Sequence, residues 1–212
     1  MTRAARAALL RGIYVIANEG EPDPSAIVRG ALSAGVRVVQ YRAKRGIVVE
    51  RLRELRRLTR ECGALLLLDD DARAAVEFDC DGVHLGPDDR GFANVAPIRA
   101  ALGSRLIGLS CGTPAEARAA TSDVDYIGAG AVYATASKDD AGDPIGVAGL
   151  QRVAGATTLP VAAIGGIGAG NLDAVARTGV AMAAVISAVA NDPDPAAAAA
   201  RLVRIWNEAS PA

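Results

Sequence analysis

The chain is poor in several features that mark particular classes of protein. Of its 212 residues only 3% are aromatic, and 23 basic residues nearly balance 24 acidic ones, for a formal net charge of -1. Nucleic-acid binding ordinarily uses a basic face and aromatic stacking platforms, so we do not expect it. No apolar run approaches the ~20 residues of a membrane span. We therefore expect small-molecule substrates as partners, neither nucleic acid nor a membrane, and we leave open a homo-oligomer.

Cysteine is also scarce. Cys62, Cys80 and Cys111 are odd in number and widely separated, which suits buried thiols in a reducing compartment better than disulfides or a zinc site. The first ten residues carry two arginines, and the apolar stretch after them runs into a strand-like segment without a clear cleavage site. We expect a helical lead-in over residues 1–10, one domain over residues 1–212, and a cytoplasmic location.

Eight short runs rich in Val, Ile and Leu alternate with longer helical patterns. Most of the runs are continuously apolar, as in parallel strands that are covered on both faces. The predicted strands are Ile13–Ala17, Val36–Tyr41, Leu65–Asp69, Gly82–Leu85, Leu106–Ser110, Tyr126–Ala129, Val161–Ile164 and Ala183–Ile186.

The segments between the strands carry helix signals. Val49–Leu58 places leucines in one stripe, and Thr113 and Asp194 each precede a proline, the pattern of a helix cap followed by its first residue. Trp206 is expected to pack in the last helix. Repeated strand–helix alternation allows an open doubly wound sheet or a closed barrel. The count of eight, even spacing and absence of a linker favour an α/β fold, a single (β/α)8 TIM barrel with eight parallel strands.

In such a barrel the carboxyl ends of the strands form the active face. Gln40, Arg42 and Lys44 alternate at the end of the second strand and therefore point to one side. An amide and two cations there suit a polyanion such as a diphosphate. The other interpretation is a solvated strand end with surface charges.

Carboxylates follow the third and fourth strands. Asp69, Asp70 and Asp71 are consecutive, and Asp88 and Asp89 lie in the next strand's loop. Asp71 suits a helix N-terminus. Asp70 with a carboxylate of the neighbouring loop would suit Mg²⁺, which takes carboxylates, waters and substrate phosphate oxygens.

The remaining strand ends contribute small and polar groups. Ser110 suits a helix cap or hydrogen-bond donor, because no neighbour could activate it as a nucleophile. Gly165-Gly166 and Ser187 end the last two strands, which form the usual phosphate cup of these barrels. The long loop over 130–146 is a candidate lid. His84, the only histidine, lies inside a strand at a position whose parity is opposite to that of a strand-end ligand, so it is expected to point away from the strand-end residues and to be packed and hydrogen-bonded, not catalytic.

Seven of these segments, in this order, resemble thiamine-phosphate synthase over about Tyr14 to Val189. They are residues 39–44, 69–71, 81–86 with 88–89, 108–111, 134–138, 163–167 and 185–187. The resemblance implies that a pyrimidine diphosphate and a thiazole phosphate join with release of pyrophosphate. It implies Mg²⁺ as cofactor, held by Asp70 and Asp89. The catalytic groups it implies are Arg42, Lys44, Ser110 and Lys138. The substrate-binding residues it implies are Gln40, Arg42, Lys44, Asp69, Ser110, Thr135, Ser137, Lys138, Gly166, Ile186 and Ser187.

The chain departs from the family pattern in two places. Asp69 stands where the family usually has asparagine, and its charge near a diphosphate must be offset, with Arg42, Lys44 and Mg²⁺ as candidates. Ala134 and Ala136 replace prolines in the lid, which loosens it. Two alternatives stay open. A related thiazole tautomerase would use a histidine where Gly112 stands, and a non-catalytic phosphate-binding barrel would act as a regulator.

Overall fold

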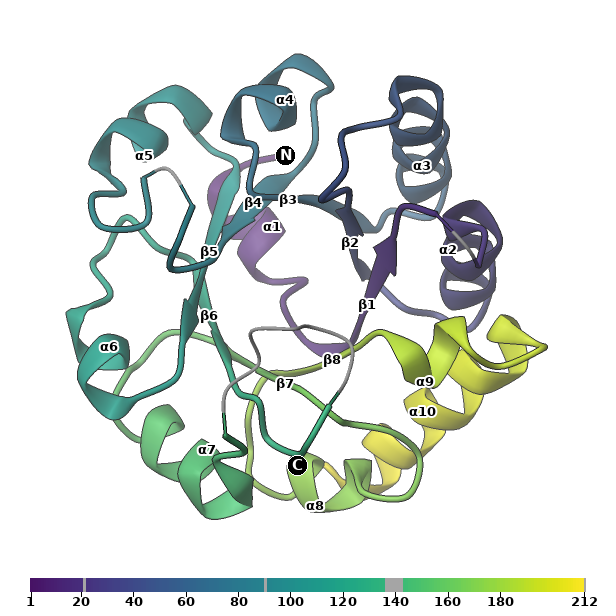
Figure 1. Cartoon of the computed structure of the whole chain (residues 1–212), viewed down its shortest axis with the longest axis vertical. Coiled ribbons are helices and arrows are strands. Elements are labelled where there is room, and N and C mark those ends of the chain that lie inside the picture. Colours follow the sequence, from purple (N-terminus) through teal and green to yellow (C-terminus); the bar gives the residue numbers. More distant parts are fainter. Residues whose placement is uncertain (21, 90, 136–142, 212) are drawn as a thin grey trace.

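The structure is a computed structural model that describes residues 1–20, 22–89, 91–135 and 143–211. Eight parallel strands close into a barrel in sequence order, with β1 pairing both β2 and β8. Helices surround this ring, as Figure 1 shows in a view along the barrel. The predicted (β/α)8 barrel is therefore confirmed.

The strands lie within two residues of their predicted bounds. They are β1 Gly12–Asn18, β2 Val38–Arg42, β3 Leu65–Asp69, β4 Gly82–Leu85, β5 Leu106–Cys111, β6 Tyr126–Ala129, β7 Val161–Ile164 and β8 Met182–Val185. The helices are α1 Arg3–Ala7, α2 Pro24–Ser33, α3 Val49–Glu61, α4 Ala72–Glu77, α5 Ala96–Leu102, α6 Pro114–Ala119, α7 Gly146–Ala154, α8 Leu172–Ala176, α9 Ser187–Ala190 and α10 Pro195–Ala209. Within the described ranges, no helix combines the length and apolar composition that crossing a bilayer requires.

Local sequence signals account for several of these helices. Thr113 and Glu116 form a reciprocal capping box at the start of α6, which satisfies two backbone donors at that end. The Asp194 side chain accepts from two backbone N–H groups of α10. Leu52 and Leu55 of α3 are fully buried against the barrel, and Trp206 packs in α10 with 7% of its surface exposed. These predictions are confirmed.

The core has two layers, because successive side chains of a strand point to opposite faces. One set packs between the strands and the surrounding helices. The other fills the barrel interior and includes Leu65, Leu67, Leu106 and Met182. Leu10 belongs to this interior cluster, and Ala7 and Leu9 pack against it. The N-terminal segment therefore closes the amino end of the barrel, where α1 crosses the opening in Figure 1.

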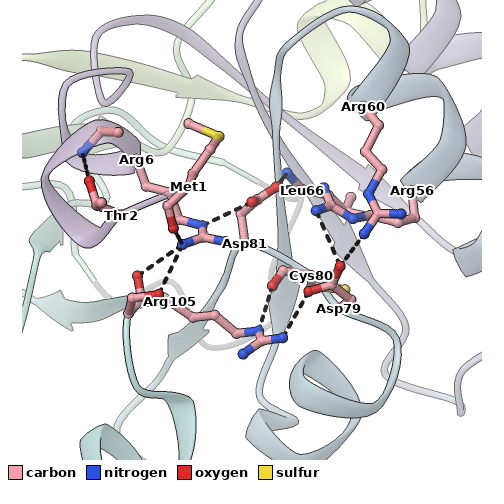
Figure 2. Close-up of polar contacts among 12 residues, drawn as sticks. Met1, Thr2, Arg6, Arg56, Arg60, Leu66, Asp79, Cys80, Asp81 and Arg105 are labelled. Atoms are coloured by element: carbon pink, nitrogen blue, oxygen red, sulfur yellow. Dashed lines mark hydrogen bonds and ion pairs between the residues drawn. The ribbon is translucent and has the colours of Figure 1, made fainter.

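Two buried aspartates fasten α1 to the barrel. Asp81, directly before β4, accepts from Arg6 of α1 at 3.0 Å, from Arg56 of α3 at 2.6 Å and from the Leu66 N–H at 3.1 Å, as Figure 2 shows. Asp125, directly before β6, repeats the pattern. Its partners are Arg3 at 2.6 Å, Arg99 of α5 at 2.5 Å and the Ile107 N–H at 2.7 Å.

The Asp81 cluster predicts a large stability effect. The Asp81 side chain is only 3% exposed and the Arg6 side chain 8%, so Asp81→Ala leaves two arginines and a backbone donor without their acceptor. We expect its free energy of unfolding in urea to fall by about 3–5 kcal/mol. Glu61→Ala removes an exposed partner of Arg57 within α3 and is the control, with a loss of about 0.5 kcal/mol or less. Equal losses in the two variants would contradict this account of α1.

Candidate active site

A cavity of about 400 Å³ lies at the carboxyl ends of the strands, the face on which a barrel enzyme carries its site. Many of the predicted site residues line it. They are Arg42, Lys44, Asp69, Asp70, Asp89, Ser110, Thr135, Gly166, Ile186 and Ser187. Gln40 lies deeper in the barrel and is 2% exposed. Ser137 and Lys138 fall in residues 136–142, outside the described residues.

The Asp69 carboxylate contacts two cationic side chains that line the cavity. It lies 3.3 Å from Arg42 Nε and 3.3 Å from Lys44 Nζ, and it accepts a 2.7 Å hydrogen bond from Gln40 Nε2. The expectation that Arg42 and Lys44 offset its charge is confirmed. Both cations face the cavity that an anionic substrate would enter, so Asp69 competes with that substrate for them.

Asp70 and Asp89 come together from neighbouring loops. Lys44 Nζ donates to Asp70 at 2.5 Å, and Asp89 accepts from the Gly86 N–H at 2.5 Å. Burial and the hydrogen bond with Asp70 raise the pKa of Asp89 to about 6. Burial also acts to raise the pKa of Asp70, but hydrogen bonds from Asp89 and Lys44 lower it overall. The pKa values of the two carboxyl groups are thus moved apart, as expected for two carboxylates that share one site.

This pair fits the ligand preferences of Mg²⁺. In the part of the chain that is described, no three His, Cys, Asp or Glu side chains group as a metal site. Mg²⁺ is usually held by one or two carboxylates, with waters and substrate phosphate oxygens completing its shell. Asp71 is not part of the pair, because its side chain caps α4 by accepting from the Arg73 and Ala74 N–H groups. The assignment of Asp71 to a helix N-terminus is confirmed.

Glycines shape the opposite wall of the cavity. Gly165 and Gly166 follow β7 with φ of 99° and 63°, a left-handed conformation that glycine adopts without strain. A Cβ on Gly166 would come within 2.5 Å of the Ala134 carbonyl oxygen. The segment after β6 therefore packs directly against this turn, and the Tyr133 N–H donates to the Gly165 carbonyl at 3.0 Å. The lid predicted over 130–146 includes residues outside those described.

His84 is hydrogen-bonded as expected, but its predicted place away from the strand-end residues is wrong. In the sheet register His84 pairs with Asp69 on one side and with Gly108 on the other, so its side chain shares the inward direction of the site residues and lines the cavity. Its ring nitrogens lie 3.0 Å from Tyr126 Oη and 3.1 Å from Ser110 Oγ.

Sequence reasoning also missed Tyr14 and Tyr126, which lie inside the barrel below the cavity. The available signal was glycine within a strand. A Cβ on Gly108 would lie 2.1 Å from the Tyr126 ring, and one on Gly128 would lie 3.1 Å from the His84 ring. Glycine inside a strand marks the close approach of another group, here two large polar rings in the barrel interior.

Cations, paired carboxylates and a glycine turn line one cavity at the carboxyl ends of the strands of a (β/α)8 barrel, the position of the active site in enzymes of this fold. Comparison with known proteins agrees. The sequence profile described as thiamine monophosphate synthase matches residues 13–189. A thiamine-phosphate synthase of Moorella thermoacetica is 41% identical over 189 residues, covering 86% of this chain and 88% of that protein.

Two further relatives extend the comparison. The thiamine biosynthesis bifunctional protein ThiM/ThiE of Symbiobacterium thermophilum is 44% identical over 192 residues, which cover 88% of this chain and 39% of that longer protein. The solved thiamine phosphate pyrophosphorylase of Pyrococcus furiosus is 36% identical, with a TM-score of 0.85, and covers 96% of this chain and 98% of its own. The chain belongs to the thiamine monophosphate synthase family, whose members are transferases of thiamine biosynthesis.

Proposed function

We propose that the chain joins 4-amino-2-methyl-5-hydroxymethylpyrimidine diphosphate to 4-methyl-5-(2-hydroxyethyl)thiazole phosphate, giving thiamine phosphate and pyrophosphate with the help of Mg²⁺. One observation carries the proposal beyond family membership. The paired carboxylates of Asp70 and Asp89 lie beside Arg42 and Lys44 at one cavity wall, and a diphosphate with its metal needs both kinds of group.

The proposed reaction is dissociative. The bond between the pyrimidine methylene carbon and the diphosphate oxygen breaks, and the electron pair leaves with the diphosphate. The thiazole nitrogen then attacks the methylene cation and forms the new C–N bond. Such a reaction needs no enzymic nucleophile, but it needs stabilisation of the leaving charge and a second substrate held in line.

The residues divide between these two tasks. Asp70 and Asp89 would hold Mg²⁺, which supplies charge to the leaving diphosphate when it is bound. Arg42, Lys44 and Lys138 would neutralise the rest of that charge. Gln40 and Ser110 would orient the pyrimidine. The thiazole phosphate would be bound by Thr135, Ser137, Gly166, Ile186 and Ser187.

The direct test is incubation of the purified chain with both substrates and Mg²⁺, followed by chromatographic detection of thiamine phosphate and an assay for pyrophosphate. We expect both products in equal amounts. Conversion of the thiazole phosphate alone would favour the tautomerase, and phosphate binding without any turnover would favour the regulatory barrel.

The carboxylate pair predicts metal dependence. Asp70 has a φ of 64°, which asparagine tolerates better than alanine, so Asp70→Asn and Asp89→Asn are the suitable variants. We expect each to lower kcat by roughly 10²-fold or more, because leaving-group stabilisation is lost, and to raise the Mg²⁺ concentration needed for half-maximal rate.

Asp71→Asn is the matched control for these variants. It removes the neighbouring negative charge but keeps a side chain that caps α4 equally well, so rate and Mg²⁺ requirement should stay near wild type. Full activity of both Asp70→Asn and Asp89→Asn in EDTA would refute the metal assignment.

The ion pairs of Asp69 predict a different outcome at the adjacent position. Asp69→Asn releases Arg42 and Lys44 for the diphosphate, so the variant should bind the pyrimidine diphosphate at least as tightly as wild type. The gain should reach roughly fivefold, the size of one partly exposed ion pair. Its Mg²⁺ requirement should be no higher. A titration that showed a much higher requirement would instead make Asp69 a metal ligand.

A further inference from the structure

A chain of hydrogen bonds crosses the barrel interior beneath the cavity. It starts at Asp69, which accepts from Gln40 Nε2 at 2.7 Å. Gln40 Oε1 accepts from the Tyr14 hydroxyl at 2.9 Å, and Tyr14 Oη lies 3.2 Å from Tyr126 Oη. Gln40, Tyr14 and Tyr126 are each at most 2% exposed, so bulk water does not replace these partners.

The chain continues to the cavity surface. Tyr126 Oη lies 3.0 Å from His84 Nδ1, and His84 Nε2 lies 3.1 Å from Ser110 Oγ. Both His84 and Ser110 line the cavity. Gly108 and Gly128 leave the room that the two rings occupy, since a Cβ at either position would contact one of them closely. We call this series of six residues from Asp69 to Ser110 the relay.

The carboxylate at one end fixes the direction of the first bonds. Asp69, ion-paired with two cations, only accepts, so the Gln40 amide must present its NH₂ group to it. The Gln40 carbonyl then faces Tyr14 and takes that hydroxyl's single proton. Tyr14 can therefore only accept from Tyr126, which must donate. Burial raises the pKa of both tyrosines, which keeps these protons in place.

Counting protons in the same way determines the tautomer of His84 and the direction of the hydrogen bond at Ser110. The Tyr126 hydroxyl donates its single proton to Tyr14, so toward His84 it can only accept. The proton of the His84 imidazole therefore lies on Nδ1. In the neutral imidazole Nε2 is then an acceptor. The Ser110 hydroxyl must donate to it. Ser110 consequently turns only oxygen lone pairs toward the cavity, although a serine can in general donate or accept.

We propose that Tyr14, Tyr126 and His84 are positioning residues that hold Ser110 as a hydrogen-bond acceptor, so that the substrate group meeting Ser110 is an N–H donor. The second part rests on the proposed function, in which the amino group of the pyrimidine is that donor. The diphosphate, which carries acceptor oxygens only, is then left to Arg42 and Lys44. A pyrimidine with an oxo group in place of the amino group would face Ser110 with two acceptors and no proton between them.

The tautomer can be measured without any substrate. Because His84 is the only histidine, protein labelled with ¹⁵N-histidine contains a single imidazole outside any purification tag, which must be removed. At pH 8 the ¹⁵N spectrum should show a protonated Nδ1 and an unprotonated Nε2. A spectrum with the proton on Nε2 would overturn the relay.

Tyr14→Phe tests the transmission, because Tyr14 is linked to His84 through the Tyr126 hydroxyl. Without the Tyr14 hydroxyl, the Tyr126 proton loses its acceptor and can turn to His84 Nδ1, so the imidazole proton should shift toward Nε2. Tyr126→Phe is a second variant, which removes the acceptor of Nδ1 directly and should also lose the single Nδ1–H form. If these variants fold and still give the ¹⁵N spectrum of wild type, the coupling of the two tyrosines to the His84 tautomer is refuted.

Tyr41→Phe is the matched control. Tyr41 is fully buried, but its hydroxyl donates to Glu19 at 2.6 Å and accepts from the Val48 N–H at 3.3 Å, outside the relay. Tyr41→Phe thus removes one hydroxyl group from a buried tyrosine, as Tyr14→Phe does. Its ¹⁵N spectrum should match that of wild type, which separates the relay from a general loss of stability.

Substrate selection is the second readout. Wild type should favour the aminopyrimidine diphosphate over its oxo analogue by roughly 10²-fold or more in kcat/KM, since a site built around one hydrogen bond rejects a mismatched group. In Tyr14→Phe that ratio should fall by roughly tenfold, because Ser110 is then able to donate, and Tyr41→Phe should keep it. A changed tautomer with an unchanged ratio would show that Ser110 does not meet the amino group. If the chain turned over neither compound, the proposed function would be wrong. The ¹⁵N spectra would still test the relay, because they need no substrate.

Discussion

The alternation of side chains along parallel strands controls both the core and the site of this protein. In a closed barrel every second residue of a strand points inward, so each strand contributes a row of side chains along its length to one shared interior. At the amino end those positions hold Leu65, Leu106 and Met182. Further along the same direction they hold Gln40, His84 and Ser110. The site is therefore the polar continuation of the apolar interior, positioned by the same strand pairing that builds the core.

Much of this arrangement could be predicted from the sequence because its signals are local. Apolar runs mark the strands, Thr113 and Asp194 mark the helix starts, and Asp70 and Asp89 follow adjacent strands. Neighbouring strands in a barrel bring their ends together, so the spacing predicts a carboxylate of the next loop beside Asp70. The choice of Asp89 over Asp88 rests on the family resemblance. The Asp69 ion pairs with Arg42 and Lys44 are expected on a different ground, since a carboxylate close to a diphosphate needs its charge offset by nearby cations.

Other features depend on partners far apart in the sequence. Arg6 meets Asp81 across 75 positions, and Tyr14 meets Tyr126 across 112. Neither pair has a local pattern, because an arginine near the N-terminus or a tyrosine in a strand suits surface and core equally well. His84 was misplaced for a related reason. Its apolar neighbours point outward to the helices, whereas its own side chain shares the barrel interior with Asp69.

Asp69 links the two halves of the site. An asparagine there could either donate or accept, so the Gln40 amide could take both orientations and the bonds beyond it would have no fixed direction. A carboxylate removes that freedom, because it accepts in every case. The cost is that Arg42 and Lys44 are shared with an internal charge. Exchanging asparagine for aspartate thus trades some attraction for the diphosphate against a defined polarity at Ser110, where the other end of the pyrimidine would lie.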